Sequence, residues 1–509
     1  MFLLLIFFAL LLAPVITEAS TVSTNNSDEV RGLIKKAAKL TRNGQLIDAE
    51  SLLRRAVSLD PEDNDAKVEL AYVLVKRRKL LDAYNTCLPV VEREPNNSRA
   101  FAVMGATLLY AGRFLDSRGF FTNAIRINKK EHLAWAGLGM LNFYENNIDD
   151  SRNHLLKALD LKPDEPDYLF ACAQTAGRGE RFKEAADHYA RFLLVSNDVD
   201  KDRRDRIRGL INFLRILGLK GKLYTTEGRD QTSVPFEMEN DRPIINLRIN
   251  DKSEPLRFVL DTGSGISVVS DTTAKRLGIS PITKGGYAKG IGGDGKFEIV
   301  YGLVRKVSIG DISIKNVPVY LRKFQDQTQR VDGYIGLALI SKFLTTIDYG
   351  NNTFALTKRP DDKQEFQKSE EVSLPLRLTS SGFLSGEVQL QGIDSLLNFI
   401  VDTGASLSVI SERVANHDGI LPFANDEKMR VIGSAGIRDD VSSFLLPRVT
   451  FGKHSRTSIK AVALDLDLIN ESTGFEQAGI LGGNFLKNYR LTFDFINSKV
   501  VFEPIRSEN

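Results

Sequence analysis

The chain has 509 residues, of which 42% are hydrophobic and 26% are charged, the ordinary balance of a globular protein. A chain of this length has room for three or four domains. Lysine and arginine number 68 against 65 aspartates and glutamates, so the formal net charge of +3 gives no reason to expect a nucleic-acid partner.

The first segment of the chain, residues 1–16, is apolar and uncharged. Thr17 and Ala19 then supply small residues at positions that a signal peptidase reads. We therefore expect residues 1–19 to be a secretory signal, and we expect the protein to be exported to a periplasm or to the extracellular space. The apolar run is shorter than the roughly 20 residues of a membrane-spanning helix, so membrane attachment is expected only if the signal stays uncleaved.

Small residues recur with a 34-residue period in the part of the chain that follows. Pro61, Pro95 and Pro163 lie at that interval or twice that interval and would end the repeats. Such spacing indicates stacked helical hairpins, in which small residues let two helices approach closely. The two series are Ala37, Ala71, Gly105, Gly139 and Ala173, and Ala49, Ala83, Ser117, Ser151 and Ala185.

This pattern resembles the tetratricopeptide repeat (TPR) family over about residues 30–199, in five units. Residues 200–218 combine charged and apolar residues at helical spacing and are expected to cap the last unit, so the helical domain would span residues 30–220. In TPR proteins the concave groove generally holds a peptide or a protein partner. The resemblance implies such a partner here.

A polar stretch at residues 221–243 ends the helical periodicity, and we interpret it as an interdomain linker. Beyond it, short runs of Val, Ile, Leu and Phe alternate with Asn-Asp, Gly-Gly and Asp-Gly pairs, which is typical of β-structure. A second polar stretch, residues 358–371, divides this region into two halves, 244–357 and 372–509. We expect each half to be one small all-β domain.

The two halves contain nearly the same segment. Residues 258–270 read FVLDTGSGISVVS, and residues 399–411 read FIVDTGASLSVIS. One Asp-Thr-Gly sequence is a common turn. Two copies in matching apolar frames can bring Asp261 and Asp402 together across a pseudo-two-fold axis, where two carboxylates share one proton.

Two further elements follow each motif in the same order. A glycine-rich turn lies at residues 289–302 in the first half and at residues 430–444 in the second. An apolar element that contains a central glycine then lies at residues 332–349 and at residues 478–495. The shared order indicates duplication of a complete domain.

These three elements resemble the retropepsin-like domains of the aspartic protease group, which are all-β barrels. The expected fold class is therefore an all-α TPR superhelix followed by two retropepsin-like domains. The resemblance implies that Asp261 and Asp402 are the catalytic carboxylates, and that the threonines hydrogen-bond across the two loops while the glycines allow close backbone approach. The supporting residues would be Thr262, Gly263, Ser264, Thr403 and Gly404.

The resemblance also implies that the glycine-rich turns are flaps that cover a bound substrate, although such a stretch can be an ordinary hairpin. No histidine is evident near Ser264 to activate it as a nucleophile, so we expect its hydroxyl to hydrogen-bond the Asp261 carboxylate. The flap candidates are Gly290, Gly292, Gly293, Gly433 and Gly436.

The five histidines are scattered, and no two have metal-ligand spacing within one of the β domains. We therefore expect neither a metal site nor another cofactor. A pair of carboxylates suffices for peptide hydrolysis, because one can activate water while the other protonates the amide.

The leading interpretation is an exported aspartic endopeptidase that hydrolyses a polypeptide substrate, with TPR repeats that recruit the substrate or a protein partner. We expect the TPR groove to lie away from the catalytic pair. One alternative is a catalytically silent scaffold whose β domains only bind peptides. In another, each half pairs with its counterpart in a second chain, and the sequence leaves open which aspartate carries the proton.

Overall fold

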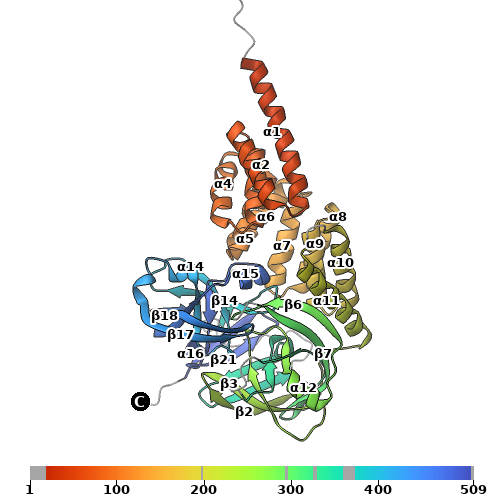
Figure 1. Ribbon diagram of the computed structural model, residues 1–509, viewed down its shortest axis with the longest axis vertical. Helices are drawn as coiled ribbons and strands as arrows, with labels where there is room; N and C mark the ends of the chain where they lie inside the picture. The colour runs from red at the N-terminus through yellow and green to blue at the C-terminus, as the bar shows by residue number, and fades with distance from the viewer. Residues whose placement is uncertain (1–18, 197–198, 293–295, 325–329, 359–372, 506–509) are drawn as a thin grey trace, which may run out of the picture.

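Figure 1 shows the computed structural model, in which residues 19–196, 199–292, 296–324, 330–358 and 373–505 are described. Helices form an elongated N-terminal domain, and the strands form two lobes below it in this view. This arrangement confirms the predicted fold class. The predicted signal sequence, apart from its last residue, lies outside the described residues.

Consecutive helices of the N-terminal domain pair into hairpins. The second helix of each hairpin begins 34 residues after the second helix of the hairpin before it, which confirms the predicted period. Within the described parts of the chain, every helix is too short or too polar to cross a bilayer. The helices are α1 (Ala19–Arg42), α2 (Leu46–Leu59), α3 (Asn64–Lys76), α4 (Leu80–Arg93), α5 (Ser98–Tyr110), α6 (Phe114–Ile127), α7 (His132–Tyr144), α8 (Ile148–Leu161), α9 (Pro166–Arg178), α10 (Phe182–Val195) and α11 (Lys201–Leu219).

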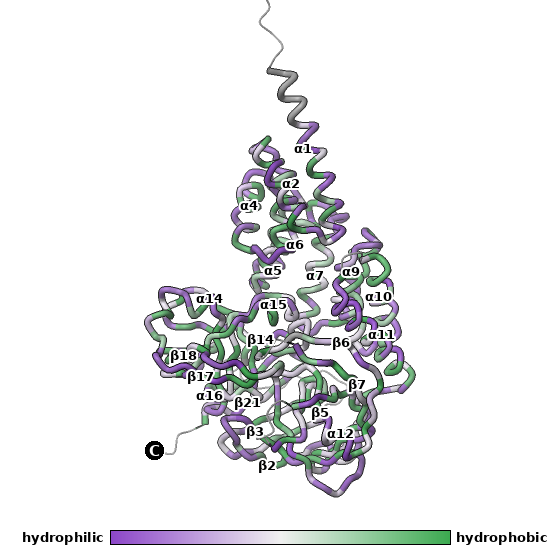
Figure 2. Tube along the Cα trace, in the orientation of Figure 1, coloured by the Kyte–Doolittle hydropathy of each residue, from purple (hydrophilic) through white to green (hydrophobic). Residues whose placement is uncertain are grey.

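The small residues of the repeats lie where the two helices of a hairpin touch. A Cβ atom added to Gly105 would lie 2.7 Å from the Phe121 ring, and one added to Gly139 would lie 2.6 Å from Leu155. The Ser117 hydroxyl donates a 2.8 Å hydrogen bond to the Gly105 carbonyl, which joins the two predicted series. Figure 2 shows hydrophobic and hydrophilic residues alternating along these helices, as expected when one face of each helix is buried.

The first lobe is built from a chain of paired strands with two short helices. Its parallel β4–β9 pair carries the first Asp-Thr-Gly loop. Its elements are β1 (Thr225–Gly228), β2 (Gln231–Glu239), β3 (Arg242–Ile249), β4 (Leu256–Leu260), β5 (Ser267–Ser270), α12 (Asp271–Leu277), β6 (Thr283–Lys289), β7 (Lys296–Ile309), β8 (Ile312–Arg322), β9 (Gly333–Ile335), α13 (Leu337–Ile340), β10 (Phe343–Asp348) and β11 (Thr353–Lys358).

The second lobe repeats this order, with its parallel β15–β20 pair at the equivalent place. Its elements are β12 (Ser373–Pro375), β13 (Arg377–Leu378), β14 (Leu384–Leu390), β15 (Leu397–Val401), β16 (Ser408–Ser411), α14 (Glu412–Ala415), the 3₁₀ helix η1 (Leu421–Phe423), β17 (Ala424–Gly433), β18 (Gly436–Phe451), β19 (His454–Leu464), α15 (Asp467–Thr473), β20 (Gly479–Leu481), α16 (Gly483–Leu486), β21 (Tyr489–Asp494) and β22 (Lys499–Pro504).

A shared sheet joins the two lobes. Its strands lie in the order β12-β22-β21-β10-β11-β2, and the central pair β10–β21 is antiparallel with Thr346 opposite Thr492. The two halves therefore pair within one chain.

The segment 221–243 is not the irregular linker that its polar composition suggested. It contains β1 and β2, and β2 pairs with β11 in the shared sheet and with β3 of the first lobe. Thr232 and Phe236 are buried, Val234 between them is half-buried, and most other residues of β2 are exposed. This alternation of buried and exposed side chains is the one feature typical of a strand in an otherwise polar segment. The second predicted linker, residues 358–371, begins at the last residue of β11 and otherwise lies outside the described residues.

The helical domain packs firmly on both lobes. Phe475 of the second lobe inserts its ring among helical side chains, 4.8 Å from Phe114 and 5.0 Å from Tyr144 between ring centroids. On the first lobe, Tyr301 of β7 stacks on Phe213 of α11 at 4.4 Å. Buried aromatic contacts of this kind fix the position of the helices relative to the lobes.

Candidate active site

Asp261 and Asp402 occupy equivalent loops, one after β4 and the other after β15. The Asp261 N–H donates to the Ile335 carbonyl at 3.0 Å, and the Asp402 N–H donates to the Leu481 carbonyl at 3.0 Å. The apolar elements that the sequence repeats downstream thus hold the two aspartates in place through β9 and β20.

Thr262 and Thr403 lock the two loops together. The Thr262 hydroxyl donates to the Val401 carbonyl at 2.7 Å and accepts the Thr403 N–H at 3.0 Å. The Thr403 hydroxyl donates to the Leu260 carbonyl at 2.7 Å and accepts the Thr262 N–H at 3.2 Å. Both side chains are fully buried, and only a hydroxyl can donate and accept in this way.

Gly263 and Gly404 each lie against the carboxylate of the opposite loop. A Cβ atom at Gly263 would be 2.3 Å from Cγ of Asp402, and one at Gly404 would be 2.7 Å from Cγ of Asp261. No real side chain tolerates such distances, so glycine is what allows the two loops to close on each other. The two carboxyl groups face each other between the lobes and are hydrogen-bonded.

The two carboxyl groups are not equivalent. Burial raises the pKa of Asp261 well above its ordinary value of 3.8, and the charge of Asp402 and their shared hydrogen bond raise it further. Burial also raises the pKa of Asp402, but the N–H of Gly404, the hydrogen bond with Asp261 and the N–H of Ala405 lower it. These N–H groups donate to Oδ1 of Asp402 at 2.7 and 3.2 Å. The shared proton is therefore favoured on Asp261, and the negative charge on Asp402.

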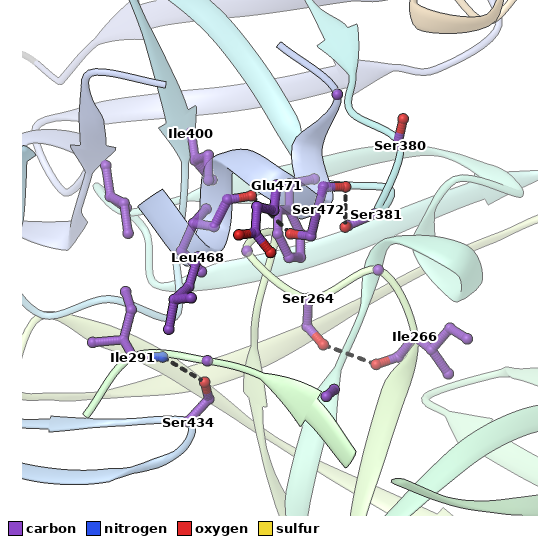
Figure 3. A pocket seen from close by; sticks show the side chains of 18 of the residues that line it. Ser264, Ile266, Ile291, Ser380, Ser381, Ile400, Ser434, Leu468, Glu471 and Ser472 are labelled. Carbon is purple, nitrogen blue, oxygen red and sulfur yellow. Dashed lines mark hydrogen bonds between the residues drawn. The ribbon is translucent and has the colours of Figure 1, made fainter. Parts of the chain in front are cut away.

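The glycine-rich hairpins meet each other at their tips. The Ala435 N–H, at the β17–β18 tip, donates to the Ile291 carbonyl of the β6–β7 tip at 2.7 Å. The Ile291 N–H donates in return to the Ser434 hydroxyl at 3.3 Å, as Figure 3 shows. Arg322 of β8 also donates to the Ser434 carbonyl.

The predicted flap glycines lie at this junction. A Cβ atom at Gly292 would be 2.0 Å from the Gly436 carbonyl oxygen, and one at Gly433 would be 2.3 Å from the Ile291 carbonyl oxygen. A Cβ atom at Gly290 would be 2.3 Å from the Ser434 hydroxyl. Four of the five flap candidates are thus brought together, and the fifth, Gly293, lies outside the described residues.

Comparison with protein families agrees with this geometry. Residues 245–339 and 387–485 match the aspartyl protease family model. Residues 40–106 match a tetratricopeptide repeat family model. The chain combines tetratricopeptide repeats with two aspartyl protease domains. A search of curated protein sequences gave no match.

Solved structures similar to the chain include TPR proteins. A thermophilic TPR protein of Thermus thermophilus is 22% identical, covers 36% of this chain and 98% of its own length, and has a TM-score of 0.32. The pilF protein of Pseudomonas aeruginosa is 16% identical, with coverages of 38% and 91% and a TM-score of 0.29. MamA of Desulfovibrio magneticus is 18% identical, with coverages of 33% and 95% and a TM-score of 0.24.

Ser264, in the first aspartyl protease domain, has a different partner from the one expected. Its hydroxyl donates to the Ile266 carbonyl at 2.8 Å and not to the Asp261 carboxylate (Figure 3). The chain turns immediately after the Asp-Thr-Gly sequence, which brings this carbonyl within reach of the serine. The prediction of a hydrogen bond from Ser264 to the Asp261 carboxylate was therefore wrong.

One cavity of about 1880 Å³ contains the Asp261–Asp402 pair and the flap tips. The same cavity is lined by side chains of the TPR domain, among them Tyr72, Tyr110 and Arg203. The expectation that the TPR groove lies away from the aspartate pair was wrong, because the docked helices place their concave face beside the two loops.

Sequence reasoning also missed Arg242, which is buried and lines this cavity. Its positive charge lowers the pKa of Asp261, an effect smaller than those of burial and of Asp402. Arg242 starts β3 but falls inside the segment interpreted as a linker, so no signal in the sequence singled it out. Among the described residues, no group of three or more His, Cys, Asp or Glu side chains is placed to hold a metal ion.

Proposed function

We propose that the protein is an exported aspartic endopeptidase with a single catalytic site formed by Asp261 and Asp402. The observation that carries the proposal is the pair of carboxyl groups held face to face, one favouring the proton and the other the charge. The apolar segment at residues 1–16 supports export.

The chemistry follows from the asymmetry of the pair. The Asp402 carboxylate accepts a proton from a water molecule as the water oxygen attacks the peptide carbonyl carbon. The Asp261 carboxyl group gives its proton to the carbonyl oxygen, which completes a tetrahedral gem-diol. Proton transfer from Asp402 to the amide nitrogen then breaks the C–N bond, and Asp261 recovers a proton from the gem-diol. Water is consumed, and the pair returns to its starting state.

The substrate is an extended polypeptide that lies between the flap tips and the aspartate loops. Ile291, Ser434 and the Asp261–Asp402 pair all line the same cavity. The hairpins must separate to admit a chain, because their tips are hydrogen-bonded to each other. Activity requires one proton on the pair, so the rate should rise with pH as Asp402 ionises and fall as Asp261 loses its proton.

The experiment is cleavage of an unfolded polypeptide by the purified protein. Asp261→Asn and Asp402→Asn should each reduce the rate by about 100- to 10,000-fold while the protein stays folded. Asp418→Asn, an exposed aspartate of the second lobe, is the matched control and should leave the rate unchanged. A folded wild-type protein that binds peptides but never cleaves them would favour the silent scaffold instead.

A further inference from the structure

The cavity at the aspartate pair extends far along the helical domain. Its volume of about 1880 Å³ exceeds the roughly 300–1,000 Å³ of ordinary small-molecule pockets. Most of its helical lining comes from α3, α5, α7, α9 and α11, the first helix of successive hairpins together with the capping helix, while α6, α8 and α10 each contribute one residue. Representative lining residues are Tyr72, Tyr110, Met140, Gln174 and Arg203 on these helices and Arg78 in the turn that follows α3.

Among the described residues, a helix of the TPR domain contacts one of the two symmetry-related turns that flank the cleft, whereas the other turn pairs with the opposite lobe. The pseudo-two-fold symmetry relates the β2–β3 turn at Asp241 to the β13–β14 turn at residues 379–383. Arg178 of α9 donates to the Thr379 carbonyl at 2.5 Å, so the helices cover the second of these turns. The Asp241 turn instead pairs with Lys487 of the other lobe at 2.9 Å.

Helix α15 connects this end of the cleft to the helices. The Ser381 hydroxyl donates to the Ser472 carbonyl at 2.7 Å, which ties the β13–β14 turn to α15. Figure 3 shows Leu468 and Glu471 of α15 beside the same cavity as Ser264. A chain that leaves the aspartate loops at this end therefore passes α15 and meets the concave face of the repeats.

The helical lining of the cavity carries five cations and three aspartates together with several aromatic rings. Lys76 is paired with Asp167 and Arg77 with Glu50, whereas Arg78 and Arg203 lie over aromatic rings. The Arg78 guanidinium lies over the Tyr110 ring at 4.8 Å, and Arg203 lies over the Phe170 ring at 5.2 Å. In the described part of the chain, neither arginine has a carboxylate within ion-pair distance. A guanidinium stacked on a ring keeps its N–H edges available for a carboxylate.

We propose that the concave face of the TPR domain is a one-sided extension of the substrate cleft. It binds an extended, acidic segment of the same polypeptide, located on one side of the scissile bond. Arg78 and Arg203 pair with carboxylates of that segment, and the tyrosines of the groove contact its backbone. The role in cleavage rests on the proposed peptidase function.

Binding is tested with the full-length Asp402→Asn protein and two fluorescent 20-residue peptides, one of repeating Glu-Ser-Gly and one of repeating Lys-Ser-Gly. The acidic peptide should bind more tightly than the basic one. Arg78→Ala and Arg203→Ala should each weaken binding of the acidic peptide about tenfold. Arg126→Ala, an exposed arginine of α6 outside the cavity, is the matched control and should not change it. Equal affinity for both peptides, or no effect of either groove substitution, overturns the inference.

Cleavage provides the second test. A short cleavable peptide is extended by an acidic segment at its N-terminal or at its C-terminal side, and kcat/KM is measured with the wild-type protein. Extension on one side only should raise kcat/KM, mainly through a lower KM, and Arg78→Ala should remove the gain while leaving the short peptide unaffected. A gain on both sides or on neither contradicts the one-sided groove. Absence of any cleavage, with selective binding of the acidic peptide intact, counts against the peptidase proposal alone.

Discussion

The hydroxyl oxygens of Thr346 and Thr492 lie 3.2 Å apart at the junction of the two lobes. These residues are 146 positions apart and occupy the same place in β10 and β21, so each half meets its own counterpart there. The contact marks the pseudo-two-fold axis within a single chain. The same axis brings the two Asp-Thr-Gly loops together above the shared sheet.

Thr403→Val should destabilise the junction of the loops. The change removes a hydroxyl that donates to the Leu260 carbonyl and leaves the buried Thr262 N–H without its acceptor. We expect a loss of about 1–3 kcal/mol in the free energy of unfolding, measured by urea denaturation. Thr403→Ser keeps the hydroxyl and should retain most of the stability; equal losses in the two variants would show that the hydrogen bonds are not the cause.

Gly263→Ala should abolish cleavage without unfolding the protein. The added methyl group would lie 2.3 Å from Cγ of Asp402 and must push the two loops apart. We expect kcat to fall about 100-fold or more, because the proton can no longer be shared. Gly119→Ala in α6 meets no atom within 4 Å and is the control. Wild-type activity in Gly263→Ala would contradict the close approach of the loops.

The aspartate pair should make stability depend on pH. A raised carboxyl pKa means that the folded state holds its proton more tightly than the unfolded chain does. The associated stabilisation is complete below the ordinary pKa of 3.8 and is lost as pH rises through the folded pKa. Asp261→Asn should therefore raise Tm relative to wild type at about pH 8 and have little effect at about pH 3. Calorimetry at the two pH values measures Tm of both proteins. A Tm difference that is the same at both pH values would count against a raised pKa of Asp261.

Helix α11 should control the first flap. A Cβ atom at Gly209 would lie 2.3 Å from the Lys284 carbonyl oxygen of β6, and Arg206 donates to the Tyr287 carbonyl at 2.9 Å. Gly209→Ala should displace the β6–β7 hairpin and lower kcat/KM about tenfold. Gly218→Ala on the same helix, whose Cβ would meet Phe182 at 3.8 Å, should be harmless. Equal kcat/KM values in the two variants would show that the contact between α11 and the β6–β7 hairpin does not affect catalysis.

The sequence predicted those features of the structure that arise from short motifs repeated along the chain. The 34-residue spacing predicted the hairpins, because a small residue such as Gly105 must face a large one such as Phe121. The duplicated frames predicted that Asp261 and Asp402 would meet. Both predictions rest on patterns that appear at least twice along the chain.

Features set by contacts between distant segments were not predictable in this way. Strand β2 was not predicted, because Thr232 and Phe236 are its only buried residues and the rest of the segment is mostly polar. The position of the TPR groove depends on Phe475 inserting beside Phe114, more than 300 residues away along the chain, and neither residue stands out in the sequence. The partner of Ser264 depended on the path of a loop that composition does not determine.

If both aspartates of one chain form one site, inactive variants of each aspartate cannot restore activity to each other, and a mixing experiment can measure this. Asp261→Asn and Asp402→Asn proteins are assayed on an unfolded polypeptide separately and after unfolding and refolding together. We expect neither variant nor the mixture to cleave, because the intact aspartates remain on different chains. Substantial cleavage by either variant alone, or recovery of activity in the mixture, would show that Asp261 and Asp402 of one chain do not form a single site.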